Sequence, residues 1–151
     1  MPFCTLPNTK QGAIIDVLVM PSRPQQTALV KVGKPVPAPV PARLLIDTGA
    51  SCTSIDQTIL TQLNLTARDM IPIHTPTTGG TPHQVPQYDI GLAIPLVQPG
   101  RNASPAYIIN ALPVIGTNLA AQGIQGLLGR DVLQKGLLTV NGPAGMYVLG
   151  F

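Results

Sequence analysis

Few residues in this 151-residue chain can carry out acid–base or nucleophilic chemistry. Glutamate is absent, so a catalytic carboxylate must come from one of six aspartates, Asp16, Asp47, Asp56, Asp69, Asp89 and Asp131. The two histidines and two cysteines lie too far apart in sequence to form a zinc-ligand pattern. We therefore expect chemistry that rests on aspartate, without a metal ion or other cofactor.

Asp47 stands out among the six because of its neighbours. The apolar run Ala42–Ile46 opens directly into Asp47-Thr48-Gly49, as a buried strand does when it enters a tight loop. Far downstream, residues 126–131 read Gly-Leu-Leu-Gly-Arg-Asp, which predicts a short strand that runs into a helical turn. Between these two motifs, Thr75–His83 contains two adjacent glycines and is typical of a hairpin tip.

Together these ordered motifs resemble the signatures of the single-domain, retroviral-type aspartic proteases. The match comprises Asp-Thr-Gly-Ala at 47–50, the glycine-bearing hairpin at the place of the family's flap, and the second signature at 126–131. It extends over essentially the whole chain. The resemblance implies an all-β, retropepsin-like barrel with one or two short helices, forming a single domain over residues 1–151.

The resemblance also implies a homodimer. Hydrolysis by a pair of carboxylates needs one ionised group to accept a proton from water and one protonated group to donate to the substrate carbonyl. This chain offers one such aspartate and is too short for the two-lobed form of the enzyme, so the second carboxylate would be Asp47 of another copy. The family's pattern assigns Thr48 a hydrogen bond across the dimer, and Gly49 allows the backbone to approach the substrate.

An extended polypeptide is the expected substrate, bound through main-chain hydrogen bonds and apolar pockets. Residues 77–82 would form the tip of the flap, which closes over the substrate. Leu127 matches a family position at the pocket wall, although it and Leu128 could equally belong to the core. The expected substrate-binding residues are Ala50, Ser51, Thr78, Gly79, Gly80 and Leu127.

The sequence departs from the viral pattern just after the first motif. Viral enzymes usually have an acidic residue at the position of Ser51, and it pairs with the arginine of the second signature. Arg130 therefore needs another partner, for which backbone carbonyls are candidates. Ser51 either supports the Asp47 carboxylate or caps the loop, and Cys52 is expected to be a small buried apolar residue rather than a nucleophile.

A second hypothesis keeps the fold and removes the activity. The same dimeric barrel could bind a peptide or a partner protein without cleaving it, if the two Asp47 side chains lie too far apart to act together. The distance between the two carboxylates in a dimer distinguishes this binding module from the enzyme.

The elements that must position these residues are mostly strands separated by proline and glycine. We expect a helix over Ser54–Leu63 and an exposed connection over Lys34–Pro41. The expected strands are Gln11–Met20, Thr27–Val32, Ala42–Ile46, Met70–His74, Gln84–Pro95 and Ala106–Ile115, with a final hairpin of Leu137–Val140 and Met146–Phe151.

Composition excludes several other classes. Charged residues make up only 10%, the net charge is +3, and there are five aromatic residues, so the chain has no basic stripe or stacking platform for nucleic acid. Asp16 and Pro21 interrupt the N-terminal apolar segment, which therefore reads neither as a signal peptide nor as a membrane span. We expect a cytoplasmic location with Cys4 and Cys52 as reduced thiols.

Overall fold

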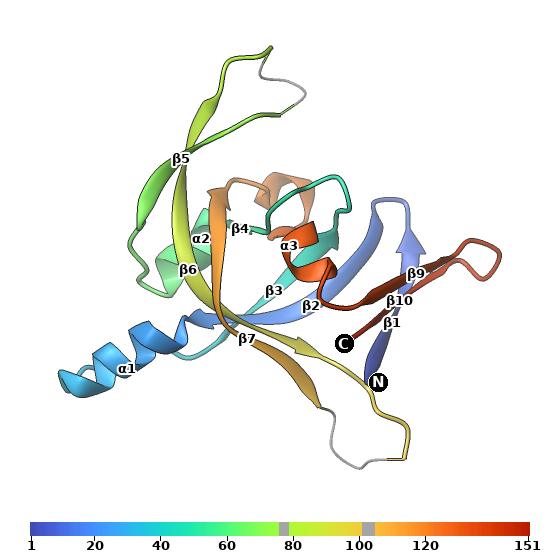
Figure 1. The fold of residues 1–151 in the computed structure, drawn as a ribbon, viewed down its shortest axis with the longest axis horizontal. Coiled ribbons are helices and arrows are strands. Elements are labelled where there is room, and N and C mark those ends of the chain that lie inside the picture. The colour runs from blue at the N-terminus through green and yellow to red at the C-terminus, as the bar shows by residue number, and fades with distance from the viewer. Residues whose placement is uncertain (76–78, 101–104) are drawn as a thin grey trace.

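The computed structural model describes residues 1–75, 79–100 and 105–151. The expected all-β architecture is confirmed: strands dominate these residues, and a closed barrel forms the centre of the molecule (Figure 1). The barrel is a ring of six strands, β2 (Gly12–Pro21), β3 (Val40–Ile46), β4 (Ser54–Asp56), β6 (His83–Pro95), β7 (Ala106–Thr117) and β8 (Gly126–Leu128).

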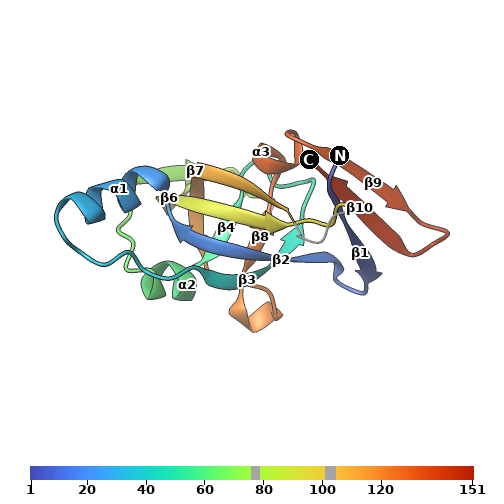
Figure 2. The same ribbon diagram turned by 90° about the horizontal axis from the view of Figure 1, so that it is seen from below.

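Around the ring the strands follow the order β6-β7-β4-β8-β3-β2, and the pairing of β2 with β6 closes it. Most neighbours are antiparallel, whereas β3 runs parallel to β8 and β4 parallel to β7. Figure 2 shows β2, β6 and β7 side by side along one side of the barrel. Closure pairs the backbone groups that would otherwise be exposed at sheet edges.

Alternating side chains explain why these segments form barrel strands. In β2, Ala13, Ile15, Val17 and Val19 are buried, whereas Asp16 between them is exposed. This two-residue period places one face of the strand in the core and the other in solvent. Each fully buried valine, leucine or isoleucine contributes about 1.5–3 kcal/mol relative to an exposed side chain.

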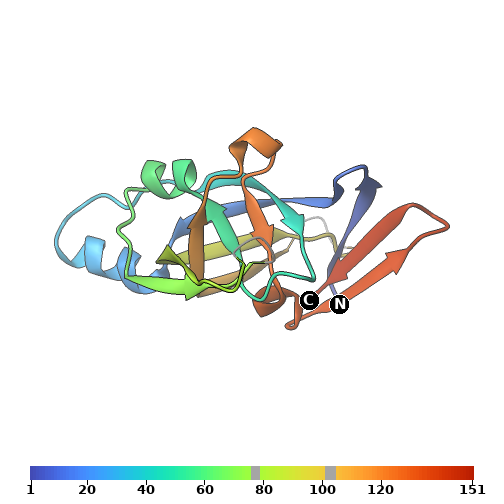
Figure 3. The same ribbon diagram turned by 90° about the horizontal axis from the view of Figure 1, so that it is seen from above.

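Four further strands lie outside the ring. β5 (Asp69–Ile73) pairs with the first half of β6, and the resulting hairpin projects from the barrel (Figure 1). Beside the barrel, β1 (Phe3–Thr9), β10 (Met146–Gly150) and β9 (Leu137–Asn141) form an antiparallel sheet, and both termini lie next to it (Figure 3). The predicted C-terminal hairpin is confirmed, and β1 extends it.

The helices differ in part from the expectation. Ser54–Asp56 belongs to β4, so the predicted helix over 54–63 is wrong at its start, and α2 covers Gln57–Gln62. Asp56 is the N-cap of this helix, and its Oδ1 accepts a hydrogen bond from the Thr58 N–H at 3.0 Å. The helical turn after β8 is α3 (Arg130–Leu133), and a 3-10 helix, η1, covers Ala120–Gln122.

The predicted strand over Thr27–Val32 is wrong. Most of this segment lies in α1 (Arg23–Lys31), which makes three α-helices among the described residues where one or two were expected. Pro24 stands in the first turn, where its missing N–H costs no hydrogen bond. The Ser22 N–H donates to Gln25 Oε1 at 3.0 Å and fixes the start of the helix.

No helix in the described part of the chain is both long enough and apolar enough to span a membrane. Cys4 and Cys52 are both free thiols and both are half-buried.

Candidate active site

Asp47 lies at the end of β3, in the loop that connects β3 to β4. Strand β8 lies between these two strands: Ile46 pairs with Leu128 on one side, and Ser54 pairs with Leu127 on the other. The loop over 47–53 therefore passes across the end of β8. The Asp47 N–H donates to the Leu128 carbonyl oxygen at 3.1 Å, which fixes the point where the loop begins.

The Asp47 carboxylate is half-buried and is held by the backbone of its own loop. Its Oδ1 accepts hydrogen bonds from the N–H groups of Gly49 at 2.8 Å and Ala50 at 3.2 Å. Oδ2 makes no hydrogen bond to the residues that the structure describes. A Cβ at position 49 would lie 3.1 Å from Oδ1, so glycine gives the carboxylate room there. One oxygen is thus fixed in place and the other is available to a water molecule or a second carboxyl group.

A second segment, residues 129–131, is hydrogen-bonded to the loop and supports it. The Thr53 N–H donates to Asp131 Oδ2 at 2.9 Å, and the Thr53 hydroxyl donates to Asp131 Oδ1 at 2.7 Å. The Gly129 N–H donates to the Thr53 hydroxyl oxygen at 3.1 Å, and the Arg130 N–H donates to the Ala50 carbonyl at 3.0 Å. These four hydrogen bonds connect the middle of the loop and its Thr53 end to the start of α3.

The two glycines of the second motif allow this close approach. A Cβ on Gly129 would lie 2.5 Å from the Cys52 carbonyl carbon, and a Cβ on Gly126 would overlap the Ser54 carbonyl oxygen. Real side chains do not tolerate such contacts. Glycine at 129 is therefore a packing requirement of the Asp47 loop, and glycine at 126 is one of strand β4 beside it.

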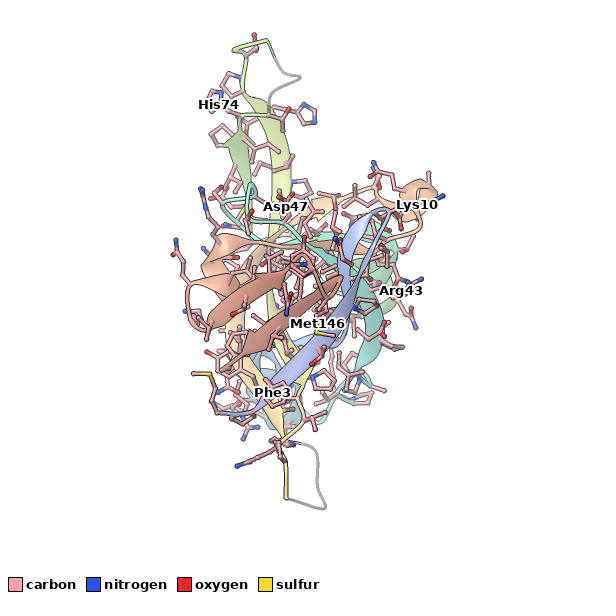
Figure 4. All side chains as sticks on the ribbon, turned by 90° about the vertical axis from the view of Figure 1, so that its right-hand side faces the viewer. Phe3, Lys10, Arg43, Asp47, His74 and Met146 are labelled. Carbon is pink, nitrogen blue, oxygen red and sulfur yellow. The ribbon has the colours of Figure 1, made fainter. Side chains whose placement is uncertain are left out.

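The β5–β6 hairpin projects on the side of the molecule where Asp47 lies. In Figure 4, Asp47 is at the foot of the hairpin and His74 lies further out along it. Gly79 and Gly80 form an exposed turn at its tip, and both have positive φ angles, 57° and 89°, which favour glycine. Thr78 and the rest of 76–78 lie outside the described residues.

The remaining predicted site residues surround the loop in different environments. Thr48 and Ser51 are exposed, whereas Ala50 and Leu127 are half-buried. Leu128 is fully buried and belongs to the core. The structure thus brings residues 47–51 and Leu127 together around the end of β8.

Ser51 does not contact the Asp47 carboxylate among the hydrogen bonds of the described residues. Its hydroxyl bonds to the Cys52 thiol instead. Burial raises the pKa of Cys52, and the nearby charge of Asp131 raises it further, while the Ser51 hydrogen bond lowers it. The raised pKa keeps this sulfur protonated near neutral pH, which makes it a poor nucleophile.

Arg130 is exposed and forms no ion pair with any described residue. Its backbone N–H bonds to the loop, as described above, but no described backbone carbonyl accepts a hydrogen bond from its guanidinium group. The partner expected for this side chain is therefore not found within the described part of the chain.

The other five aspartates are engaged away from the Asp47 carboxylate. Asp56 is buried, and it accepts hydrogen bonds from Thr58, Leu119 and Ala120. Asp131 is bound to Thr53. Asp89 forms an ion pair with Arg68 at 3.0 Å, Asp69 accepts a hydrogen bond from the Met70 N–H at 2.8 Å, and the exposed Asp16 lies 3.9 Å from Arg43. Among the described residues there is also no cluster of three or more His, Cys or Asp side chains that could hold a metal ion.

Sequence reasoning did not identify Thr53 and Asp131 as a supporting pair. Asp131 lies within the second motif, but nothing local indicates that its carboxylate reaches Thr53. Thr53 follows Asp47 by six residues, and Asp131 follows Gly129 and Arg130. The link between Thr53 and Asp131 is visible only when the fold brings the two motifs together.

Comparisons with known proteins agree with this geometry. A family model described as aspartyl protease matches residues 30–132, which include both motifs and the hairpin. The fold is similar to the crystal structure of a retropepsin-like aspartic protease from Rickettsia conorii, with a TM-score of 0.59 and 12% sequence identity. That match covers 99% of this chain and 90% of the other. No curated protein sequence matches significantly.

Proposed function

The chain belongs to the aspartyl protease family, and on this basis we propose that it is a homodimeric aspartic endopeptidase. Asp47 from each of two copies would activate the water that hydrolyses a peptide bond. The observation that carries the proposal is the Asp47 carboxylate itself: two N–H groups fix one oxygen, and the other oxygen is available for chemistry.

The requirement for a second copy follows from the aspartates. The reaction needs two carboxyl groups in one site, and each of the other five aspartates in the chain already has a partner elsewhere. A second Asp47, related by a two-fold axis, supplies the missing group without changing any of these contacts. The exposed Thr48 would then face the equivalent loop of the partner and hydrogen-bond across the interface.

The two carboxyl groups share one proton, as they do in aspartic proteases generally. The ionised carboxylate accepts a proton from water, and the water oxygen attacks the peptide carbonyl carbon. The protonated carboxyl group donates its proton to the carbonyl oxygen, so a neutral tetrahedral intermediate forms. Breakage of the C–N bond, with proton transfer to the nitrogen, then releases an amine and a carboxylic acid and regenerates the shared proton.

The substrate would bind as an extended segment between the Asp47 loop and the β5–β6 hairpin. Gly79 and Gly80 would let the hairpin tip close over it and exclude water. Leu127, half-buried beside the loop, would contribute to an apolar pocket. The backbone of Ala50 already bonds to Asp47 and Arg130, so only the second lone pair of its carbonyl oxygen remains for a substrate N–H.

Digestion of a defined peptide library tests the proposal. Wild type and Asp47→Asn are incubated with the library at several pH values from mildly acidic to neutral, and cleavage is measured by mass spectrometry. Asp47→Asn keeps the shape of the side chain but removes its ionisable group, so cleavage should be lost while the melting temperature is unchanged. Asp16→Asn is the matched control, because Asp16 is exposed and makes only a 3.9 Å ion pair with Arg43.

Two results would contradict the proposal. Cleavage by Asp47→Asn at the wild-type rate would exclude Asp47 as the catalytic group. A stable wild-type dimer that binds library peptides and cleaves none of them at any pH would instead indicate the non-catalytic binding module.

A further inference from the structure

Residues 22–39 form an excursion that the barrel does not need. Strands β2 and β3 pair directly up to Val19 and Val40, and an antiparallel pair of this kind is usually joined by two to five residues. Here the connection instead contains α1 and an extended segment with prolines at 35, 37 and 39. No residue of α1 is buried, so the helix adds little to the core.

The excursion encloses a groove on one side of α1, which we name the α1 groove. Its volume is about 480 Å³, and it lies between the helix, the extended segment and the connection from α2 to β5. Gln25 and Asn64 supply amide groups to its lining. Its apolar walls come mainly from Leu29, Val32, Pro35, Pro37, Leu63 and Leu65.

Three cations lie in residues 22–39, and Lys34 is the one that lines the groove. Arg23, Lys31 and Lys34 are exposed, and none forms an ion pair with a described residue. The sequence has no acidic residue between Asp16 and Asp47, so residues 22–39 carry a net charge of +3 from these three cations. The groove therefore combines apolar walls and one lining lysine with the positive net charge of the surrounding segment.

Exposed apolar side chains lie on two faces of this segment: Val32 lines the α1 groove, and Val30 lies on another face. Val30 and Val32 are 67% and 66% exposed, on an element that buries nothing. A second hollow of about 330 Å³, on another face of α1, is lined by Arg23, Val30 and Val36. Because α1 buries no side chain against the barrel, its apolar and basic side chains are available to a ligand.

We propose that the α1 groove binds an acidic polypeptide segment whose apolar side chains enter the groove. Lys34 and the positive net charge of residues 22–39 favour acidic residues by charge complementarity, and the walls accept apolar side chains. The Gln25 NH2 group and the Asn64 amide can bond to peptide groups, since the Gln25 oxygen is already occupied by the Ser22 N–H. A nucleic acid is a poorer fit, because the lining contains no aromatic side chain on which a base could stack.

The groove is separate from the candidate active site. Its lining contains no residue of the 47–53 loop or of the β5–β6 hairpin. Figures 1 and 2 show α1 at one end of the molecule and the β1, β9 and β10 sheet at the other. A bound segment would therefore leave both regions free. If the proposed protease activity holds, the groove would recruit acidic polypeptides to the enzyme, and this consequence rests on the proposed function.

A displayed library of random dodecapeptides tests the binding itself. The full chain carrying Asp47→Asn serves as bait, so the result does not depend on cleavage. Enriched peptides are then labelled and titrated by fluorescence anisotropy. We expect them to be acidic and to contain leucine, isoleucine or valine. Binding should be about tenfold weaker or worse in Lys31→Glu/Lys34→Glu, because charge reversal replaces attraction by repulsion. Val32→Ser should also weaken it.

The matched control is Lys10→Glu/Lys135→Glu, which changes the net charge equally at exposed positions elsewhere. Equal loss of affinity in both double variants, or enrichment of peptides without acidic residues, would overturn the proposal. The proposal would also fail if no peptide is enriched and the chain instead binds phosphatidylserine vesicles, duplex DNA or a second copy of itself, with that binding lost in Lys31→Glu/Lys34→Glu. Peptide binding without any wild-type hydrolysis would refute only the protease.

Discussion

The buried Thr53 donates two hydrogen bonds to Asp131, one to each carboxylate oxygen, across 78 positions of sequence. Thr53 lies at the end of the loop that begins with Asp47, and Asp131 lies in the first turn of α3. The same threonine hydroxyl accepts a hydrogen bond from the Gly129 N–H, so it connects Asp131 and Gly129 to the loop. Asp131 is thus a positioning residue for the loop rather than a catalytic one.

Asp131→Ala should leave the Thr53 N–H and hydroxyl without acceptors. An unsatisfied buried donor costs about 1–3 kcal/mol, so urea denaturation should report a loss of at least that size. A loop displacement of about 1 Å would lower kcat by about a hundredfold. Asp131→Asn keeps one acceptor oxygen and should recover part of both effects. Wild-type kcat in Asp131→Ala would show that Asp131 does not position the loop.

Gly129→Ala should be strongly destabilising, because its methyl group would lie 2.5 Å from the Cys52 carbonyl carbon. Overpacking of this kind costs about 1–3 kcal/mol. Gly142→Ala is the control: its Cβ would meet no atom within 4 Å, so thermal unfolding should be unchanged. Equal melting temperatures for the two variants would contradict the packing requirement.

Mixing experiments should reveal the dimer. When wild type is equilibrated with an excess of Asp47→Asn, most wild-type chains enter heterodimers that hold one carboxylate instead of two. Activity per wild-type chain should therefore fall toward zero as the variant is added. Addition of the same excess of Asp16→Asn should cause no such loss. Undiminished activity per chain with the Asp47→Asn variant would mean that a single chain is sufficient.

Simultaneous replacement of Gly79 and Gly80 by valine should impair hydrolysis far more than stability. Both positions have positive φ, which valine tolerates poorly, but the turn is exposed and contributes little to the core. Gly33→Val introduces similar strain at φ 70° in another exposed turn and should leave turnover of short peptides unchanged. A large drop in melting temperature with normal turnover in the Gly79/Gly80 variant would argue against a flap.

Asp56 should make the fold sensitive to acid. Burial alone would raise the pKa of Asp56, but hydrogen bonds from Thr58, Leu119 and Ala120 hold it below its ordinary value. A depressed folded-state pKa stabilises the protein above the unfolded-state pKa of about 3.9, and this stabilisation is lost as pH falls through the folded-state value. Between pH 6 and 2, the free energy of unfolding should therefore decrease more for wild type than for Asp56→Asn. Parallel curves would contradict this role.

The barrel was predictable because its strands carry a local signal. The apolar run before Asp47 and the alternation in β2 specify strands regardless of the rest of the chain. The segment over 27–32 was not, since Thr27, Val30 and Val32 are β-branched and favour a strand by composition. The start of α1 depends instead on Pro24 and on the hydrogen bond between Ser22 and Gln25, and these outweigh the preference of the later residues.

The Asp47 motif was likewise predictable as a local pattern. The residues that support its loop from the second motif were not. Leu128, Gly129 and Asp131 reach the loop only because β8 inserts between β3 and β4, which is a property of the whole topology. No spacing within either motif encodes the bond from Thr53 to Asp131. The role of that aspartate therefore emerges only once the two segments are in contact.

The insertion of β8 between β3 and β4 also determines when the Asp47 loop can reach its final shape during folding. Strands β2 and β3 can pair early, but the Asp47 loop lacks its supporting hydrogen bonds until residues 126–131 pack against it. Contacts over such a sequence separation form slowly, since most of the chain must first be ordered to close them. A partly folded or nascent chain thus lacks a shaped loop, so maturation of the site is coupled to completion of the barrel.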